Sequence, residues 1–396
     1  MSAAQFRGFP IMKLLLPARV LRRLVSLAPI FAGVALLAQT PVPSNAPAAA
    51  PKAGGRGPQA APVISPEIKT DRQVTFRLRA ANAKAVTVSG QFTRGATAMT
   101  KDDTGLWSVT VGPVEPGVYE YSLNVDGIAM IDPGNRDVKP MRAPRTSILE
   151  IPGEPALIHD FQAVPHGKVT LHWYASKSLG RRRAMQVYTP PGYDADATAR
   201  FPTMYLFHGS GDNEATWVAH GRANWILDNL IAQKRAKPMI VVMLDGHAAL
   251  PGPNIARNAN TAAFERDLIE DAMPLVVASY RTREEAASRA IVGLSMGGGQ
   301  SLTIGLKHAD RFAWVGGMSS SVGNGASLIE DPAALNRQLK LLWIACGKDD
   351  TLITANKEFD AALTAKSVKH EFSETEGNHS WPVWRRYLAD FAPKIF

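Results

Sequence analysis

Short runs in which apolar and polar residues alternate fill the chain from residue 65 to about residue 153. Five of these runs are VTFRLRA, AVTVSG, LWSVTVG, YEYSLNVDG and SILEIPG. Gly, Pro or Asp separates them at intervals of roughly ten residues, and no helical pattern intervenes. Alternation with a period of two residues and regular turn signals is typical of an antiparallel sandwich. The pattern therefore predicts a small all-β, immunoglobulin-like domain over residues 65–153.

Beyond about residue 164 the apolar runs become continuous, and helical stretches separate them. The apolar runs are TMYLFHG, MIVVMLDG, AIVGLS and LLWIACG, and the helical stretches include AFERDLIEDAMPLVVASY and GGGQSLTIGLKHADRF. A continuous apolar strand is buried on both faces, and helices between such strands indicate a parallel or mostly parallel sheet. We therefore predict one α/β domain over residues 164–396.

The first 64 residues differ from the rest of the chain, because they contain no acidic residue and are rich in Ala and Pro. Basic residues, among them Arg22 and Arg23, precede an apolar run over residues 24–38, and small residues and prolines follow. This order is typical of a secretory signal; a membrane anchor would need ~20 apolar residues and would not contain Pro29. We expect a signal peptide over residues 1–38, a disordered linker of Pro, Ala and Gly over residues 39–64, and export to the periplasm or the extracellular space without stable membrane insertion.

The formal charge of +9 raises the question of nucleic acid binding. Residues 1–64 hold seven Lys and Arg and no acid, so little positive charge is left for the rest, where both signs are interspersed. A phosphate-binding surface needs clustered basic residues. We therefore predict no nucleic acid partner. The lone cysteine, Cys346, excludes an internal disulfide.

The motif Gly293-Leu294-Ser295-Met296-Gly297 stands between a predicted strand and a predicted helix. A GxSxG pattern alone is weak, but in this context it is typical of the nucleophile elbow, a strained turn that exposes the serine. Small residues are needed at positions 293 and 297 because a larger side chain there would collide with the neighbouring strand or helix. We predict Ser295 as a nucleophile and the α/β-hydrolase fold for this domain.

A serine nucleophile needs a base and an acid that orients the base, and in this fold the chain order is Ser, acid, His. The acid should follow a later strand, and Asp349 and Asp350 come directly after LLWIACGK. We favour Asp350, because a strand that ends at Gly347 and turns outward presents the third residue beyond it. His379, in a loop after the last predicted strand, is the expected base.

Two backbone donors for a tetrahedral oxyanion are expected near the nucleophile. One is the N–H of Met296, and the other is the N–H of Ser210 in the HGSG loop, with Gly211 as the alternative. Trp217 and Trp381 stand beside this loop and the base in the sequence, so they are candidates for lining a substrate site; the alternative is that each packs in the core.

No Rossmann, P-loop or HExxH pattern and no Cys/His cluster is present in the sequence, so we expect neither a cofactor nor a metal. The predicted reaction is hydrolysis of a carboxylic ester through an acyl-enzyme intermediate.

Several of these motifs recur in the order in which they stand in a known family. HGSG, GLSMGGGQS, CGKDD and EGNHSWPVWRRYL resemble carbohydrate esterase family 1, which includes feruloyl esterases, acetyl xylan esterases and enterochelin esterases. The resemblance covers about residues 155–396 and implies that the acid is the last residue of G-x-x-D, which is Asp350. Residues 65–152 are similar to the family 48 carbohydrate-binding module, although its pair of exposed tryptophans has no evident counterpart here.

The resemblance implies a substrate that is an ester-bearing carbohydrate or an aromatic ester. The leading hypothesis is removal of feruloyl or acetyl groups from plant polysaccharide. The alternatives are hydrolysis of an enterochelin-type siderophore trilactone and, from another class of protein, an inactive glycan-binding protein. The β domain either binds glycan or shapes the cleft of the esterase.

Overall fold

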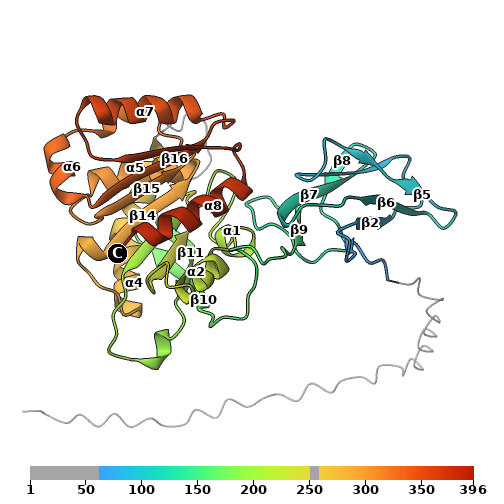
Figure 1. The fold of residues 1–396 in the computed structure, drawn as a ribbon, viewed down its shortest axis with the longest axis horizontal. Coiled ribbons are helices and arrows are strands. Elements are labelled where there is room, and N and C mark those ends of the chain that lie inside the picture. Colours follow the sequence, from blue (N-terminus) through green and yellow to red (C-terminus); the bar gives the residue numbers. More distant parts are fainter. Residues whose placement is uncertain (1–61, 250–257) are drawn as a thin grey trace, which may run out of the picture. The chain divides into compact units, whose positions relative to one another are not determined.

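The computed structural model describes residues 62–249 and 258–396. The predicted signal peptide over residues 1–38 and nearly all of the predicted linker over residues 39–64 lie outside the described residues. Residues 61–396 form one compact unit that contains both a β-sandwich and a larger α/β part (Figure 1).

Two antiparallel sheets form the sandwich, with strand orders β1-β2-β6-β5 and β4-β3-β7-β8, and β9 pairs with β7. Along β2 and β3 every second side chain belongs to the core, as the sequence pattern predicts, and Phe76, Val88 and Leu123 are fully buried between the sheets. The strands are β1 (Glu67–Ile68), β2 (Val74–Arg79), β3 (Val86–Gly90), β4 (Thr97–Ala98), β5 (Thr100–Lys101), β6 (Leu106–Val111), β7 (Gly117–Val125), β8 (Ile128–Met130) and β9 (Ser147–Ile151).

The second part is built on an eight-stranded sheet of order β10-β11-β13-β12-β14-β15-β16-β17. All neighbours from β13 to β17 run parallel, whereas β10 and β11 pair antiparallel at one edge. The strands are β10 (Lys168–Ser176), β11 (Arg181–Thr189), β12 (Thr203–Phe207), β13 (Ile240–Leu244), β14 (Arg289–Leu294), β15 (Trp314–Met318), β16 (Leu341–Gly347) and β17 (Glu371–Thr375). The antiparallel hairpin at the edge was not predicted from the sequence.

Helices cover both faces of this sheet, which explains its continuous apolar runs. On β12, Tyr205 and Phe207 join a core with α5 and α7, while Met204 and Leu206 join a core with α2 and α8 on the opposite face. The helical segments are η1 (Tyr193–Ala195), α1 (Thr216–Ala219), α2 (Ala223–Ala232), α3 (Ala259–Arg266), the π-helical η2 (Asp267–Ala272), α4 (Met273–Ser279), η3 (Ala286–Ser288), α5 (Met296–Lys307), η4 (Gly325–Leu328), α6 (Pro332–Gln338), α7 (Ile353–Ala365), α8 (Trp381–Phe391) and η5 (Ala392–Lys394).

Buried polar contacts join the sandwich to the α/β part. On α8, Arg385 is 1% exposed, and its guanidinium donates to the carbonyl oxygens of His220 (2.9 Å) and of Val118 in β7 (2.6 Å). Lys139, which follows β8, forms ion pairs with Glu120 of β7 and with Asp212 of the loop after β12. The fold class predicted from the sequence, an α/β-hydrolase preceded by a small all-β sandwich, is confirmed.

Candidate active site

Ser295 stands at the turn between β14 and α5 in a backbone conformation that side-chain-bearing residues rarely adopt, with φ 52° and ψ −115°. The turn is tight enough to need its glycines: a Cβ on Gly293 would lie 2.4 Å from the carbonyl oxygen of Gly297. A Cβ on Gly297 would lie 2.4 Å from that of His208. Such strain persists only where the surrounding structure fixes it, and it exposes the hydroxyl at the carboxyl end of the sheet.

The three side chains predicted to act together are within hydrogen-bond distance. Ser295 Oγ lies 3.0 Å from His379 Nε2, and His379 Nδ1 lies 2.9 Å from Asp350 Oδ2 and 3.0 Å from Oδ1. They come from the ends of β14, β16 and β17, which meet at one edge of a parallel sheet. Because the carboxylate accepts from Nδ1–H, Nε2 is left to accept the serine proton.

The environment of Asp350 keeps its carboxylate charged. Burial by itself raises the pKa of this carboxyl, but hydrogen bonds from His379, from the N–H of Leu352 and from the Ser319 hydroxyl outweigh it, so the pKa lies below the ordinary value of 3.8. Asp350 is 3% exposed, whereas Asp349 is an exposed residue of the same turn. The structure thus places Asp350, and not its neighbour, against the histidine.

The HGSG loop after β12 closes over the elbow. A Cβ on Gly209 would lie 3.4 Å from the Cβ of Ser295, so the loop backbone approaches the nucleophile closely. The N–H of Gly211, the alternative oxyanion donor, already donates to His247 Nε2 at 3.1 Å. In the described part of the chain the N–H of Ser210 has no acceptor within hydrogen-bond distance. Met296 begins α5, where N–H groups are unpaired, so these two donors remain the candidates.

His208 has a structural position. Its ring is 1% exposed, its Nε2 accepts from the N–H of Gly246 at 2.8 Å, and its Nδ1 lies 2.8 Å from the carbonyl oxygen of Gly209. Both nitrogens are therefore used to fix the loops after β12 and β13.

Trp217 and Trp381 do not line a substrate site. They are 1% and 2% exposed, and their rings meet edge to face at 5.0 Å between centroids. The indole N–H of Trp217 donates to the carbonyl oxygen of Phe207 at 3.0 Å. Both side chains point into the core between the sheet, α2 and α8, so the expectation that they contact substrate is wrong and the alternative that they pack in the core holds.

Two residues that support the base and the acid were missed from the sequence. Ser319, after β15 at φ 47°, hydrogen-bonds Asp350 and accepts from Trp384 Nε1 at 3.1 Å. The ring of Trp384 stands edge to face against His379, 4.8 Å between centroids. A serine after a strand and a tryptophan in the WPVW stretch of α8 carry no motif of their own, so only the fold brings them to the site.

Two hollows open beside these residues. One, of about 590 Å³, contains His379 and is lined on its other side by Gln91 and Tyr119 of the sandwich. The other lies beyond the HGSG loop, around Asp245 and His247. Among residues 62–249 and 258–396, no group of three or more His, Cys, Asp or Glu is arranged to hold a metal ion. The same residues include no helix long and apolar enough to cross a membrane.

The elbow, the order of the three side chains and the eight-stranded sheet define an α/β-hydrolase class of protein. Residues 176–395 match the family model described as "Putative esterase", which covers more than half of the chain, and the chain belongs to this esterase family. Residues 63–139 match carbohydrate-binding module 48, the isoamylase N-terminal domain.

Particular relatives extend the comparison. An endo-1,4-beta-xylanase/feruloyl esterase of Xylanibacter ruminicola is 32% identical over 338 residues, 84% of this chain and 46% of that protein. A solved ferulic acid esterase is 26% identical with a TM-score of 0.53, and it covers 58% of this chain and 97% of its own. The enterobactin esterase FES of Shigella flexneri shares the fold, with a TM-score of 0.59, 17% identity and coverage of 81% and 92%. The chain spans about half or less of the length of the first curated relatives it matches.

Proposed function

We propose that this chain is an exported serine carboxylic-ester hydrolase that removes feruloyl or acetyl groups from plant polysaccharide. The observation that carries the reaction is the chain of contacts from Ser295 Oγ through His379 to Asp350, at 3.0 and 2.9 Å. The substrate class is supported by the relative named endo-1,4-beta-xylanase/feruloyl esterase and by the solved ferulic acid esterase.

In the proposed reaction, Ser295 Oγ attacks the ester carbonyl carbon while His379 Nε2 takes the hydroxyl proton. The N–H groups of Met296 and Ser210 hold the oxyanion, a contribution of about 3–4 kcal/mol for each pre-aimed donor. His379 then gives its proton to the departing alcohol oxygen, and an acyl-enzyme forms. Water attacks this acyl group, His379 takes one water proton, and the carboxylic acid leaves as Ser295 regains its hydrogen.

The sandwich is proposed to shape the cleft rather than to act as a separate anchor. Gln91 and Tyr119 face His379 across the 590 Å³ hollow. Because the sandwich lines the hollow beside His379, it should contact any substrate large enough to fill that hollow and so influence its binding.

A panel of esters tests the proposal. Hydrolysis of methyl ferulate, acetylated xylan, enterobactin and short p-nitrophenyl esters should be measured for the wild type and for Ser295→Ala. We expect the highest kcat/KM on methyl ferulate or acetylated xylan, and loss of about 10⁶ in kcat in the variant. Preference for enterobactin would establish the siderophore alternative, and a wild type inactive on every ester would establish the inactive glycan-binding alternative.

A further inference from the structure

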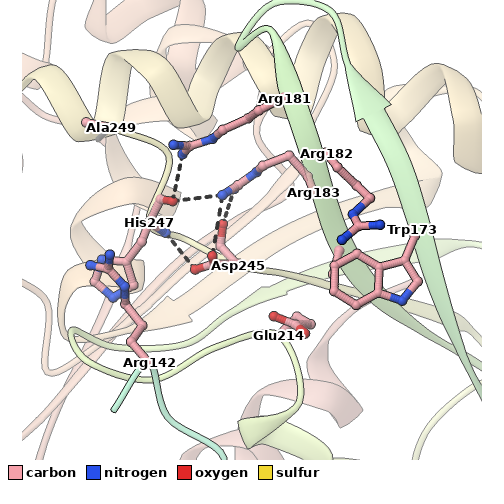
Figure 2. A pocket seen from close by; sticks show the side chains of 10 residues that line it. Arg142, Trp173, Arg181, Arg182, Arg183, Glu214, Asp245, His247 and Ala249 are labelled. Carbon is pink, nitrogen blue, oxygen red and sulfur yellow. Dashed lines mark hydrogen bonds and ion pairs between the residues drawn. The ribbon is translucent and has the colours of Figure 1, made fainter. Parts of the chain in front are cut away.

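A second pocket, of about 340 Å³, lies around Asp245 and His247, after the end of β13 (Figure 2). It adjoins the HGSG loop directly: Gly211 N–H donates to His247 of the pocket, and Gly211 O accepts from the N–H of Arg142, also of the pocket. Its lining residues are Arg142, Trp173, Arg181, Arg182, Arg183, Ala184, Glu214, Asp245, His247 and Ala249.

Two of the four arginines that line the pocket, Arg181 and Arg183, form hydrogen bonds or ion pairs with other groups of the protein. Arg183 is 4% exposed and contacts Asp267 and Asp245, and it donates to the carbonyl oxygen of His247 at 2.7 Å. Arg181 donates to the carbonyl oxygens of His247 and Ala248. Figure 2 shows these two side chains turned toward the backbone after β13, so their guanidinium groups are already paired with protein oxygens and are not free to bind a ligand.

The other two arginines face the hollow with their charge unmatched. Within the described residues, the guanidinium groups of Arg142 and Arg182 have neither a hydrogen-bond acceptor nor an ion-pair partner. Burial lowers the pKa of His247 to about 4, so this ring is neutral at pH 7 and adds no charge. With Asp245 contacting Arg183, Glu214 is the one lining carboxylate left against two open cations.

An exposed aromatic ring stands beside one of these cations. Trp173 is 60% exposed, and the guanidinium of Arg182 lies 4.9 Å from its ring centroid. The strand β10 leads up to it with two more exposed apolar side chains on the same face, Val169 and Leu171. A single solvated arginine would be ordinary. Here one pocket is lined by two arginines without a protein partner and by an exposed indole ring, and this combination suits a ligand that has a ring and an anionic group.

We propose that this pocket binds a uronic acid residue of the polysaccharide that carries the ester. The proposal rests on the proposed function and names the substrate more closely. Arg142 and Arg182 supply the charge for the sugar carboxylate, Trp173 supplies a flat surface for the pyranose ring, and Glu214 accepts from its hydroxyl groups. The contacts of Gly211 with His247 and Arg142 hold this pocket against the HGSG loop, which carries the proposed oxyanion donor Ser210.

The test compares two feruloylated xylo-oligosaccharides that differ only in one side group, a glucuronic acid or its carboxyl-reduced glucosyl counterpart. We expect the wild type to have about tenfold higher kcat/KM on the acidic one, and Arg142→Gln and Arg182→Gln each to lose about tenfold on it. Both variants should keep methyl ferulate and the neutral oligosaccharide within twofold. Trp173→Ala should lose activity on both oligosaccharides and keep it on methyl ferulate. Arg337→Gln, an exposed arginine on α6, is the matched control.

Equal kcat/KM on the two oligosaccharides, or equal losses on both in the arginine variants, would overturn the proposal. Calorimetric titration of the full chain with the unesterified acidic and neutral oligosaccharides tests it apart from turnover. If no ester is hydrolysed but the acidic oligosaccharide binds through Arg142, the proposed function fails and the binding site stands. If esters are hydrolysed and neither oligosaccharide binds preferentially, the site fails and the function stands.

Discussion

Lys139 and Asp212 form an ion pair inside the protein, with 2.9 Å between Nζ and Oδ1 and each side chain 6% exposed. Lys139 also lies 3.0 Å from Glu120 of the sandwich, so one ammonium group serves two carboxylates. Asp212 directly follows Gly211, and the pair therefore fastens the HGSG loop to the sandwich.

Removing the cation should be costly to stability. Lys139→Met leaves the buried Asp212 and the partly buried Glu120 without this counter-charge, for which we expect a loss of about 3–5 kcal/mol in the free energy of unfolding. Urea denaturation measures it. The triple variant Lys139→Met/Glu120→Gln/Asp212→Asn is the control, since it removes the unpaired charges as well and should recover most of the loss. Equal stability of Lys139→Met and the wild type would contradict the assignment.

The two neighbouring aspartates should differ sharply. Asp350→Asn keeps the shape of the acid but removes the charge that holds His379 Nδ1–H, so we expect kcat/KM on a soluble ester to fall at least about a hundredfold. Asp349→Asn changes an exposed carboxylate and should cost less than about tenfold. Circular dichroism confirms that both variants fold. A larger loss for Asp349→Asn would refute the choice of acid.

Gly297 should not tolerate a methyl group. In Gly297→Ala the new Cβ would lie 2.4 Å from the carbonyl oxygen of His208, so the elbow and the HGSG loop have to move apart. We expect about 1–3 kcal/mol of lost stability and loss of most esterase activity. Gly180→Ala, where a Cβ meets nothing within 4 Å although φ is +64°, is the control for backbone strain alone and should stay active.

Stability should fall as the pH drops below about 6.5. Burial lowers the pKa of His159 and of His247 to about 4 and that of His220 well below its ordinary value of 6.5. Between these pKa values and 6.5 the unfolded chain binds protons that the folded chain does not bind, so His159 and His220 each weaken folding by up to about 1.4 kcal/mol per pH unit, and the half-buried His247 by less because solvent screens it. Urea denaturation at pH 7, 6 and 5 measures the slope, and His159→Asn should make it shallower. A stability that is flat from pH 7 to pH 5 would contradict the burial of these rings in neutral form.

The predicted residues that the structure brings together are those whose place in the chain depends on a local signal. Ser295 is marked by a strand, two glycines and a helix, and the positions of Asp350 and His379 follow from strand ends in a known chain order. The alternation in residues 65–153 likewise depends on neighbours in the chain, which is why the sandwich was predicted.

What the sequence could not locate depends on how distant elements pack. The positions of α2 and α8 on the sheet decide whether Trp217 and Trp381 face a cleft or the core. The residues next to each tryptophan in the sequence do not reveal those positions. Arg142 and Arg182 are separated by β9 and β10 along the chain, and only the folded protein brings both to the lining of one pocket. Ser319 reaches Asp350 because β15 lies beside β16.

The buried guanidinium of Arg385 has a consequence for how this architecture can change. It stands on the helix that follows the histidine loop, and half of its hydrogen-bonding to backbone carbonyls is supplied by Val118 of the sandwich. Burial lowers its pKa to about 9, yet it remains charged at neutral pH, so exchange of the sandwich for an unrelated module would take away one of the two carbonyl acceptors of a buried cation. The two parts are therefore not freely exchangeable. A recombinant with another module in place of the sandwich has to supply a new acceptor for Arg385 or replace this residue.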